Sequence, residues 1–162
     1  MTKVKRNLVC FHSNEAMVDA FLHAGVEFVV IGGLAVSWYC PSRTADDMDL
    51  LVNPTPENSA RIFRALSKLG FGDWLAQSDF ARPAVQFSVK QYYYADILTP
   101  ESGAQTFAEI AADSDPGCLF GRPVRIASAS SLIRLKEAAA DKAEHDREKH
   151  VRDIELLRHL PY

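Results

Sequence analysis

Residues 26–52 read VEFVVIGGLAVSWYCPSRTADDMDLLV, and the rest of the chain can be understood from this stretch. Residues 26–31 are apolar and mostly β-branched apart from Glu27, which predicts a buried strand. Gly32 and Gly33 end this strand, and a helix is expected to begin at Leu34. Because glycine has no Cβ, an anion can approach the first N–H groups of such a helix closely, so the turn predicts a phosphate site.

The end of the same stretch, residues 47–52, predicts a second strand. The side-chain period of two places Asp47 and Asp49 on one face with Leu51. Two such carboxylates lie about 6–7 Å apart along a strand and repel each other unless they share a cation. Mg²⁺ (or Mn²⁺) suits them, because Mg²⁺ is commonly held by one or two carboxylates, water and substrate phosphate. An ordinary strand–helix unit with an acidic strand edge is the alternative interpretation.

Joined together, these two parts resemble a known motif. Ile31-Gly32-Gly33, thirteen intervening residues and Asp47-Met48-Asp49 resemble the core motif of the nucleotidyltransferase superfamily typified by DNA polymerase beta. The resemblance implies an α/β (α+β) nucleotidyltransferase fold, with a short mixed β-sheet flanked by helices and a C-terminal helical pair. It also implies that Asp47 and Asp49 are catalytic metal ligands and that the Gly-Gly turn binds the phosphates of an NTP.

A third acidic residue is expected on a neighbouring strand. Residues 85–89 alternate apolar and polar side chains and predict a half-buried strand, and residues 92–98 predict another, with Asp96 on the face of Tyr92 and Tyr94. The superfamily carries its third acidic residue beside the Asp-x-Asp strand, so the resemblance makes Asp96 a metal ligand and general base. A solvated aspartate at a strand end is the alternative.

Apolar residues at helical spacing, bounded by caps and turn residues, predict the remaining elements. Helices are expected over 13–24, 56–69, 104–112, 128–139 and 151–160, and a strand over 123–127. The rest of 99–122 is expected to form a loop-rich wall of a cleft, residues 8–11 a short strand or an arm, and Trp74 part of the core or a pocket wall. We expect one domain over 1–162, with a core over about 13–127 and C-terminal helices over about 128–160.

The C-terminal region extends the resemblance. Leu132-Ile133-Arg134-Leu135-Lys136, followed by Arg147-Glu148-Lys149 and Asp153-Ile154, resembles the tail of small bacterial nucleotidyltransferases related to toxin–antitoxin systems. His150 stands where that tail usually has Asp, and Ala45 stands where a second Thr is usual before Asp-x-Asp. Arg43 and Lys136 are candidates to neutralise phosphate charge, or else surface cations or ion-pair partners. The charged run 141–150, with its histidines, is expected to be solvated.

Composition bounds the class of protein. The 162 residues are 48% hydrophobic and 24% charged with a net charge of −3, which is typical of a globular protein and argues against a large nucleic-acid footprint. Cys10, Cys40 and Cys118 are widely spaced without a Cys-x-x-Cys pair, so neither disulfides nor a zinc site is expected, and the cytoplasm is the expected compartment. Neither a signal segment nor a membrane span is expected.

The resemblance implies transfer of a nucleoside monophosphate from an NTP to a hydroxyl of a protein, a tRNA or a small molecule, with release of pyrophosphate. Relatedness to the toxin group implies an antitoxin partner. Two other functions stay open from the sequence: an antibiotic nucleotidyltransferase of similar size, and a catalytically silent module that binds nucleotide or a protein partner on the same fold.

Overall fold

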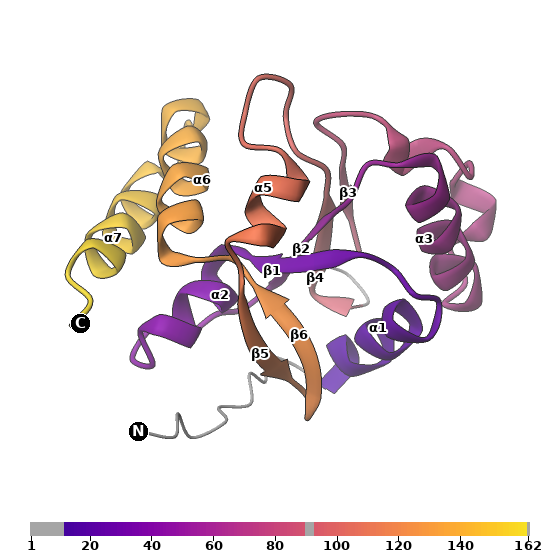
Figure 1. The fold of residues 1–162 in the computed structure, drawn as a ribbon, viewed down its shortest axis with the longest axis horizontal. Coiled ribbons are helices and arrows are strands. Elements are labelled where there is room, and N and C mark those ends of the chain that lie inside the picture. Colours follow the sequence, from indigo (N-terminus) through magenta and orange to yellow (C-terminus); the bar gives the residue numbers. More distant parts are fainter. Residues whose placement is uncertain (1–11, 90–92, 162) are drawn as a thin grey trace.

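The computed structural model describes residues 12–89 and 93–161 (Figure 1). The helices are α1 (His12–His23), α2 (Gly32–Tyr39), α3 (Pro56–Lys68), α5 (Phe107–Ala112), α6 (Ala129–Lys142) and α7 (Arg147–Arg158), with short 3₁₀ turns η1 (Gly72–Trp74) and η2 (Asp79–Ala81). The strands are β1 (Phe28–Ile31), β2 (Met48–Val52), β3 (Gln86–Ser88), β4 (Ala95–Leu98), β5 (Asp115–Leu119) and β6 (Arg122–Ile126).

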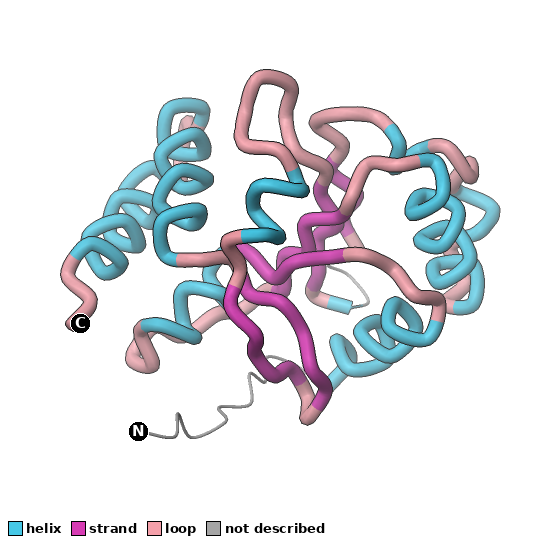
Figure 2. The backbone as a smooth tube through the Cα atoms, in the orientation of Figure 1, coloured by secondary structure: helices cyan, strands magenta, loops and turns pink. Residues whose placement is uncertain are grey.

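The strands form one mixed sheet in the order β3-β4-β2-β1-β6-β5. The pairs β1–β2, β3–β4 and β5–β6 are antiparallel, whereas β1–β6 and β2–β4 are parallel. Figure 2 shows this sheet at the centre of the molecule, between two groups of helices. In Figure 1, α6 and α7 lie side by side at the left and α1 packs with α3 at the right. The predicted mixed sheet with flanking helices and a C-terminal helical pair is confirmed.

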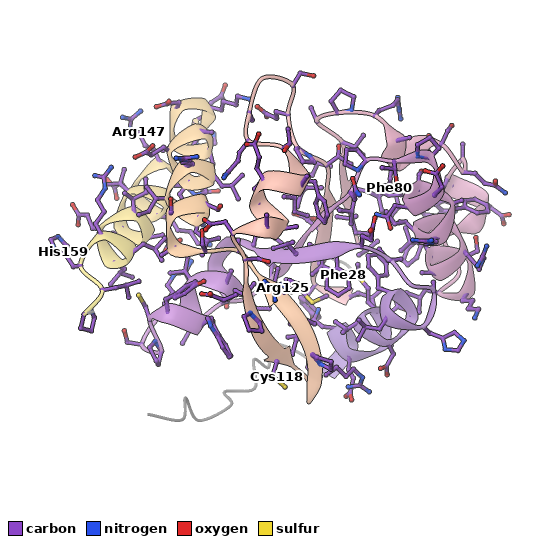
Figure 3. All side chains as sticks on the ribbon, in the orientation of Figure 1. Phe28, Phe80, Cys118, Arg125, Arg147 and His159 are labelled. Carbon is purple, nitrogen blue, oxygen red and sulfur yellow. The ribbon has the colours of Figure 1, made fainter. Side chains whose placement is uncertain are left out.

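The two strands that carry the motif are the most deeply buried part of the sheet. All four residues of β1 are buried, and in β2 only Asp49 is not. Phe28 of β1 packs edge-on against Phe21 of α1, with ring centroids 5.9 Å apart. Figure 3 shows Phe28 and Phe80 in the interior, whereas His159 lies at the outer end of the helical pair. Burial on both faces makes the register of β1 and β2 costly to change, which holds the motif in place.

Polar side chains fix the helix ends around this core. Thr55 caps α3 by accepting a hydrogen bond from Asn58 N at 3.2 Å, and Ser128 caps α6 by accepting one from Ser131 N at 3.0 Å. The far end of α2 is held by Tyr39, whose hydroxyl lies 2.8 Å from both Asp115 Oδ2 and the Ala127 carbonyl oxygen. Burial and the neighbouring Asp115 raise the pKa of Tyr39, so this hydroxyl stays protonated and able to donate.

The largest difference from the sequence prediction is the β5–β6 hairpin. Residues 115–119 were expected to be loop, because Pro116 and Gly117 usually interrupt strands. The structure places Pro116 on an edge strand, where its missing N–H costs little. A Cβ on Gly117 would lie 2.8 Å from Ile126 Cγ1 and closer still to Cδ1, so the glycine allows the strand to cross Ile126. Glycine here reports a close approach rather than a turn.

Smaller corrections concern element ends. β4 begins at Ala95, because Tyr94 has a positive φ of 51° that interrupts the predicted strand over 92–98. α7 begins at Arg147 rather than near 151, so the charged run is divided between two helices and their turn. Trp74 is 73% exposed and not part of the core. The predicted strand or arm over 8–11 and Tyr92 lie outside the described residues. Across the described part of the chain, none of the helices has the length and apolarity needed to cross a bilayer.

Candidate active site

The motif residues meet at one end of the central strands, where β1 ends and β2 and β4 begin. Asp49 pairs with Ile31 of β1 on one side and with Asp96 of β4 on the other. Asp96 in turn pairs with Ser88 of the edge strand β3. Residues paired across neighbouring strands point to the same face, so Asp49 and Asp96 lie next to each other on one face, with strands about 4.8 Å apart. We call Ile31, Asp49, Asp96 and Ser88 the cross-sheet row.

Gly32 brings the turn after β1 against this row. Its φ is +71°, a left-handed conformation that favours glycine. A Cβ on Gly32 would lie 3.0 Å from Asp49 Cγ and would overlap Oδ2, so the Asp49 carboxylate sits directly against the first residue of α2. The helix begins at Gly32, two residues before the expected start, and Ile31 has no polar side chain to cap it. The turn therefore joins a carboxylate and a helix N-terminus in one place.

Asp96 is the most buried of the predicted site residues. Asp96 is 3% exposed, and its Oδ2 accepts a hydrogen bond from Gln86 Nε2 at 3.3 Å. Gln86 belongs to β3 and lies two residues from Ser88, so both face the side of the sheet that carries Asp96. The alternation of 85–89 already placed Gln86 on the polar face of its strand, but its contact with Asp96 required the pairing of β3 with β4.

Asp47 lies outside the strand. β2 begins at Met48, whose N–H donates to the Tyr94 carbonyl oxygen at 2.8 Å, and Asp47 is half-buried in the bend that precedes it. The neighbouring Asp46 is exposed. Among residues 12–89 and 93–161, no three His, Cys, Asp or Glu side chains are arranged as a cluster that could hold a metal ion. Asp47 as a third ligand thus stays a prediction.

The donor set nevertheless fits Mg²⁺ or Mn²⁺. These cations prefer oxygen ligands, and Mg²⁺ usually takes only one or two protein carboxylates, with water and substrate phosphate completing its octahedron. Asp49 and Asp96 supply two carboxylates in register on adjacent strands, and the missing Cβ of residue 32 leaves room for the Asp49 carboxylate against the turn. A complete protein cage is not required for a metal that binds together with a triphosphate.

Arg43 and Lys136, the two predicted phosphate cations, meet at a buried aspartate of α7. Arg43 Nε lies 2.7 Å from Asp153 Oδ1, and Lys136 Nζ lies 2.9 Å from Asp153 Oδ2. Arg43 Nη2 adds a second contact to Oδ2 at 3.3 Å. Arg43 also lies at the glycine turn, because a Cβ on Gly33 would be 2.9 Å from its Nη2. We call Arg43, Lys136 and Asp153 the ion triad.

Charge and burial set the protonation of the triad. Burial raises the pKa of Asp153, but hydrogen bonds and positive charge from Arg43 and Lys136 lower it more, so the pKa lies below its ordinary value of 3.8. Hydrogen bonding to Asp153 raises the pKa of Arg43. Burial and then the charge on Lys136 lower the pKa of His150 from 6.5, against the opposing effect of Asp153. His150 is therefore half-buried beside the triad, not fully solvated as expected.

Sequence reasoning assigned no role to Asp153. A signal was present, because Asp153 occupies the same buried helix face as Ile154 and Leu157. Lys136 likewise lies four residues after the buried Leu132 on α6. A charged residue at a buried position of an amphipathic helix indicates a buried partner. What the sequence could not show is that both side chains converge on Arg43, which lies about ninety residues upstream of Lys136 in the chain.

The fold matches that of nucleotidyltransferase-like proteins. An antigenic nucleotidyltransferase-like protein from Paracoccidioides brasiliensis shares 15% identity with this chain, over 90% of this chain and 74% of its own, with a TM-score of 0.52. The solution structure of the antibiotic-resistance factor ANT(2'')-Ia shares 18% identity over 90% of this chain and 80% of its own, with a TM-score of 0.57.

A crystal structure of ANT(2'')-Ia in complex with adenylyl-2''-tobramycin is similar over 88% of this chain and 84% of its own, with 18% identity and a TM-score of 0.54. The sequence matches no protein-family model and no curated protein. At this level of identity the structural likeness establishes that the chain has a nucleotidyltransferase fold.

Proposed function

We propose that residues 1–162 form a metal-dependent nucleotidyltransferase domain that transfers a nucleoside monophosphate from an NTP to a hydroxyl group. The observation that carries this proposal is the in-register pairing of Asp49 with Asp96 beside the Gly32 turn. An ordinary strand–helix unit gives no reason to bury one aspartate beside another at the end of a strand. A site for a cation and a triphosphate gives that reason, because both carboxylates then gain a shared counter-charge.

In the proposed reaction the acceptor hydroxyl oxygen bonds to the α-phosphorus, the bond from that phosphorus to the bridging oxygen breaks, and pyrophosphate leaves. Asp49 and Asp96, with Asp47, would hold Mg²⁺ or Mn²⁺. Such a cation, when bound, offsets charge on the triphosphate and lowers the pKa of the attacking hydroxyl. Asp96 takes the hydroxyl proton as general base, and Gln86 orients its carboxylate through the hydrogen bond to Oδ2.

The phosphates are proposed to lie at Gly32 and Gly33, where the start of α2 presents backbone N–H groups. Arg43 and Lys136 would neutralise part of their charge, since Arg43 already lies against Gly33. The acceptor is proposed to be a small molecule, a protein or a tRNA. The likeness to ANT(2'')-Ia bound to adenylyl-2''-tobramycin favours a small molecule. The tail that resembles toxin-related nucleotidyltransferases favours a macromolecule and an antitoxin partner, and cysteine usage favours the cytoplasm.

The proposal is tested by incubating the protein with each α-labelled NTP in cell extract and identifying the labelled product. Asp96→Asn is expected to lower transfer about 10²–10⁴-fold at saturating NTP, because the general base is lost. Asp73→Asn, which removes an exposed carboxylate in η1, serves as control and should transfer normally. Equal transfer by wild type and Asp96→Asn would reject Asp96 as the base. If the wild type labels nothing in any extract, the silent nucleotide-binding module becomes the better interpretation.

A further inference from the structure

Asp153 lies on α7, far along the chain from the motif, yet it contacts both cations proposed to face the triphosphate. Its side chain is 1% exposed. Its two oxygens accept hydrogen bonds from Arg43 Nε at 2.7 Å and Arg43 Nη2 at 3.3 Å, and Oδ2 also forms an ion pair with Lys136 Nζ at 2.9 Å. The side chains of Arg43 and Lys136 are 18% and 9% exposed. All three charged groups of the ion triad are thus largely withdrawn from water.

The charges of the triad do not cancel. Two cations surround one carboxylate, so the triad carries a net charge of +1 when Asp153 is ionised. This excess lies at the start of α2, because Arg43 Nη2 is the atom that a Cβ on Gly33 would meet at 2.9 Å. Buried charge is unfavourable unless it is paired. The exposed Asp46 also contributes negative charge near Arg43. The excess of cations within the triad, beside a helix N-terminus, nevertheless suits an anionic ligand such as the phosphates of an NTP.

The hydrogen bonds of Arg43 show how the Asp153 carboxylate orients the guanidinium group. Asp153 binds the Nε and Nη2 sides of the guanidinium, and the Thr44 carbonyl oxygen accepts from Nη1, so the plane of the group is fixed. Nη1 and Nη2 each carry two hydrogens, and one of each serves these partners. The remaining hydrogens are left for another acceptor without breaking the contact with Asp153. A long, flexible side chain is in this way oriented before the ligand arrives.

We propose that Asp153 is a positioning residue, which holds Arg43 and Lys136 in place for the triphosphate and so makes α7 a part of the nucleotide site. This inference rests on the proposed function, because it assigns a role in binding the same triphosphate. The alternative is a merely structural role, in which Asp153 only joins α7 to α6 through Lys136. The helices α6 and α7 are also joined by Arg158 and Glu137, with Nη2 of the arginine 2.7 Å from Oε1 of the glutamate, and this second ion pair has no contact with Arg43.

The test measures binding of inorganic tripolyphosphate and of the Mg²⁺ complexes of the four NTPs by calorimetry. Asp153→Asn keeps the shape of the side chain but removes its charge, and it is expected to raise the Kd about tenfold or more. Glu137→Gln removes the other ion pair between the same two helices and should change the Kd by no more than about twofold. In an Arg43→Gln background, Asp153→Asn should have a much smaller effect, because its action through Arg43 is already lost.

Each outcome bears on the inference. If Asp153→Asn is folded and binds tripolyphosphate as tightly as the wild type, or more tightly, Asp153 does not position the cations and the inference is overturned. If Asp153→Asn does not fold, Asp153→Glu takes its place, because it keeps the charge and displaces the carboxylate by one methylene, and unchanged binding by it has the same meaning. If the wild type itself binds neither tripolyphosphate nor any NTP, the proposed function fails, which is distinguishable from failure of the Asp153 assignment alone.

Discussion

At the scale of single residues, Gly32 has the strictest requirement in the candidate site. Two constraints meet there: a left-handed backbone with φ +71° and the Asp49 carboxylate where a Cβ would lie. The sequence motif predicted a glycine for close approach of phosphate. The structure adds that the same missing Cβ makes room for a protein carboxylate, so Gly32 shapes the site before any ligand binds.

Gly32→Ala is therefore expected to impair both stability and NTP binding. Gly25→Ala is a matched control, because Gly25 has the same φ of +71° but has nothing within 4 Å of an added Cβ. The control should lose only the cost of the left-handed backbone, about 1–2 kcal/mol of unfolding free energy, and bind NTP normally. Thermal unfolding and calorimetric titration of both variants check this. Normal NTP binding by Gly32→Ala would show that the position of Asp49 against the turn is unimportant.

Separation along the chain explains why some residues of the site could be predicted and others could not. Gly32, Gly33 and the Asp-x-Asp pair follow one another closely in sequence, so their chemistry is visible in one window. Gln86 touches Asp96 only because β3 pairs with β4, and Asp153 touches Arg43 only because α7 packs near α2. Neither contact is encoded by local periodicity, since both depend on how distant elements meet.

At the scale of elements, α7 connects the C-terminal region to the motif through the ion triad. Breaking a buried ion pair by removing one partner leaves the other charge uncompensated. Asp153→Asn is thus expected to lower the free energy of unfolding at pH 7 by about 3–5 kcal/mol, since two largely buried cations lose their carboxylate.

The pH dependence of this effect has a definite sign. Because the pKa of Asp153 is lower in the folded state than its ordinary value of 3.8, the stability that its charge contributes is fully present above that value. The contribution is lost as the pH falls through the folded-state pKa. Urea unfolding of wild type and Asp153→Asn from pH 7 downward should show a difference that is kept until about pH 4, and is widened as His150 titrates because Asp153 no longer supports its charged form, and that narrows below about pH 4. A difference that stays the same down to pH 3 would contradict an ionised, paired Asp153.

Strand β5 shows the limit of prediction at this scale. Its residues, Asp115–Leu119, contain proline and glycine, which locally favour a loop. Pairing with β6 overrides that preference, because Pro116 lies at the sheet edge and Gly117 passes over Ile126. By contrast, α3 and α6 were predictable, since each is an amphipathic segment that begins at a capping side chain, Thr55 for α3 and Ser128 for α6.

At the scale of the whole molecule, the sheet order brings together residues that are separated by about fifty positions in the chain. Asp49 and Asp96 become neighbours only through the parallel pairing of β2 with β4. The pairing of Ile31 with Asp49 brings the glycine turn to the same end of these strands. The resemblance to the superfamily anticipated an acidic residue on a strand beside the Asp-x-Asp strand, where the structure places Asp96. The structural likeness to nucleotidyltransferase-like proteins concerns the fold.

The most direct test of the proposed site is calorimetric NTP binding with and without Mg²⁺. The wild type is expected to bind NTP much more tightly when Mg²⁺ is present, because the carboxylates and the triphosphate share the cation. Asp47→Asn with Asp49→Asn should abolish that difference and leave the fold intact, while Asp46→Asn, with its exposed side chain, should preserve it. A folded double variant whose NTP binding keeps the full dependence on Mg²⁺ would contradict the assignment of the metal and triphosphate to this end of the central strands.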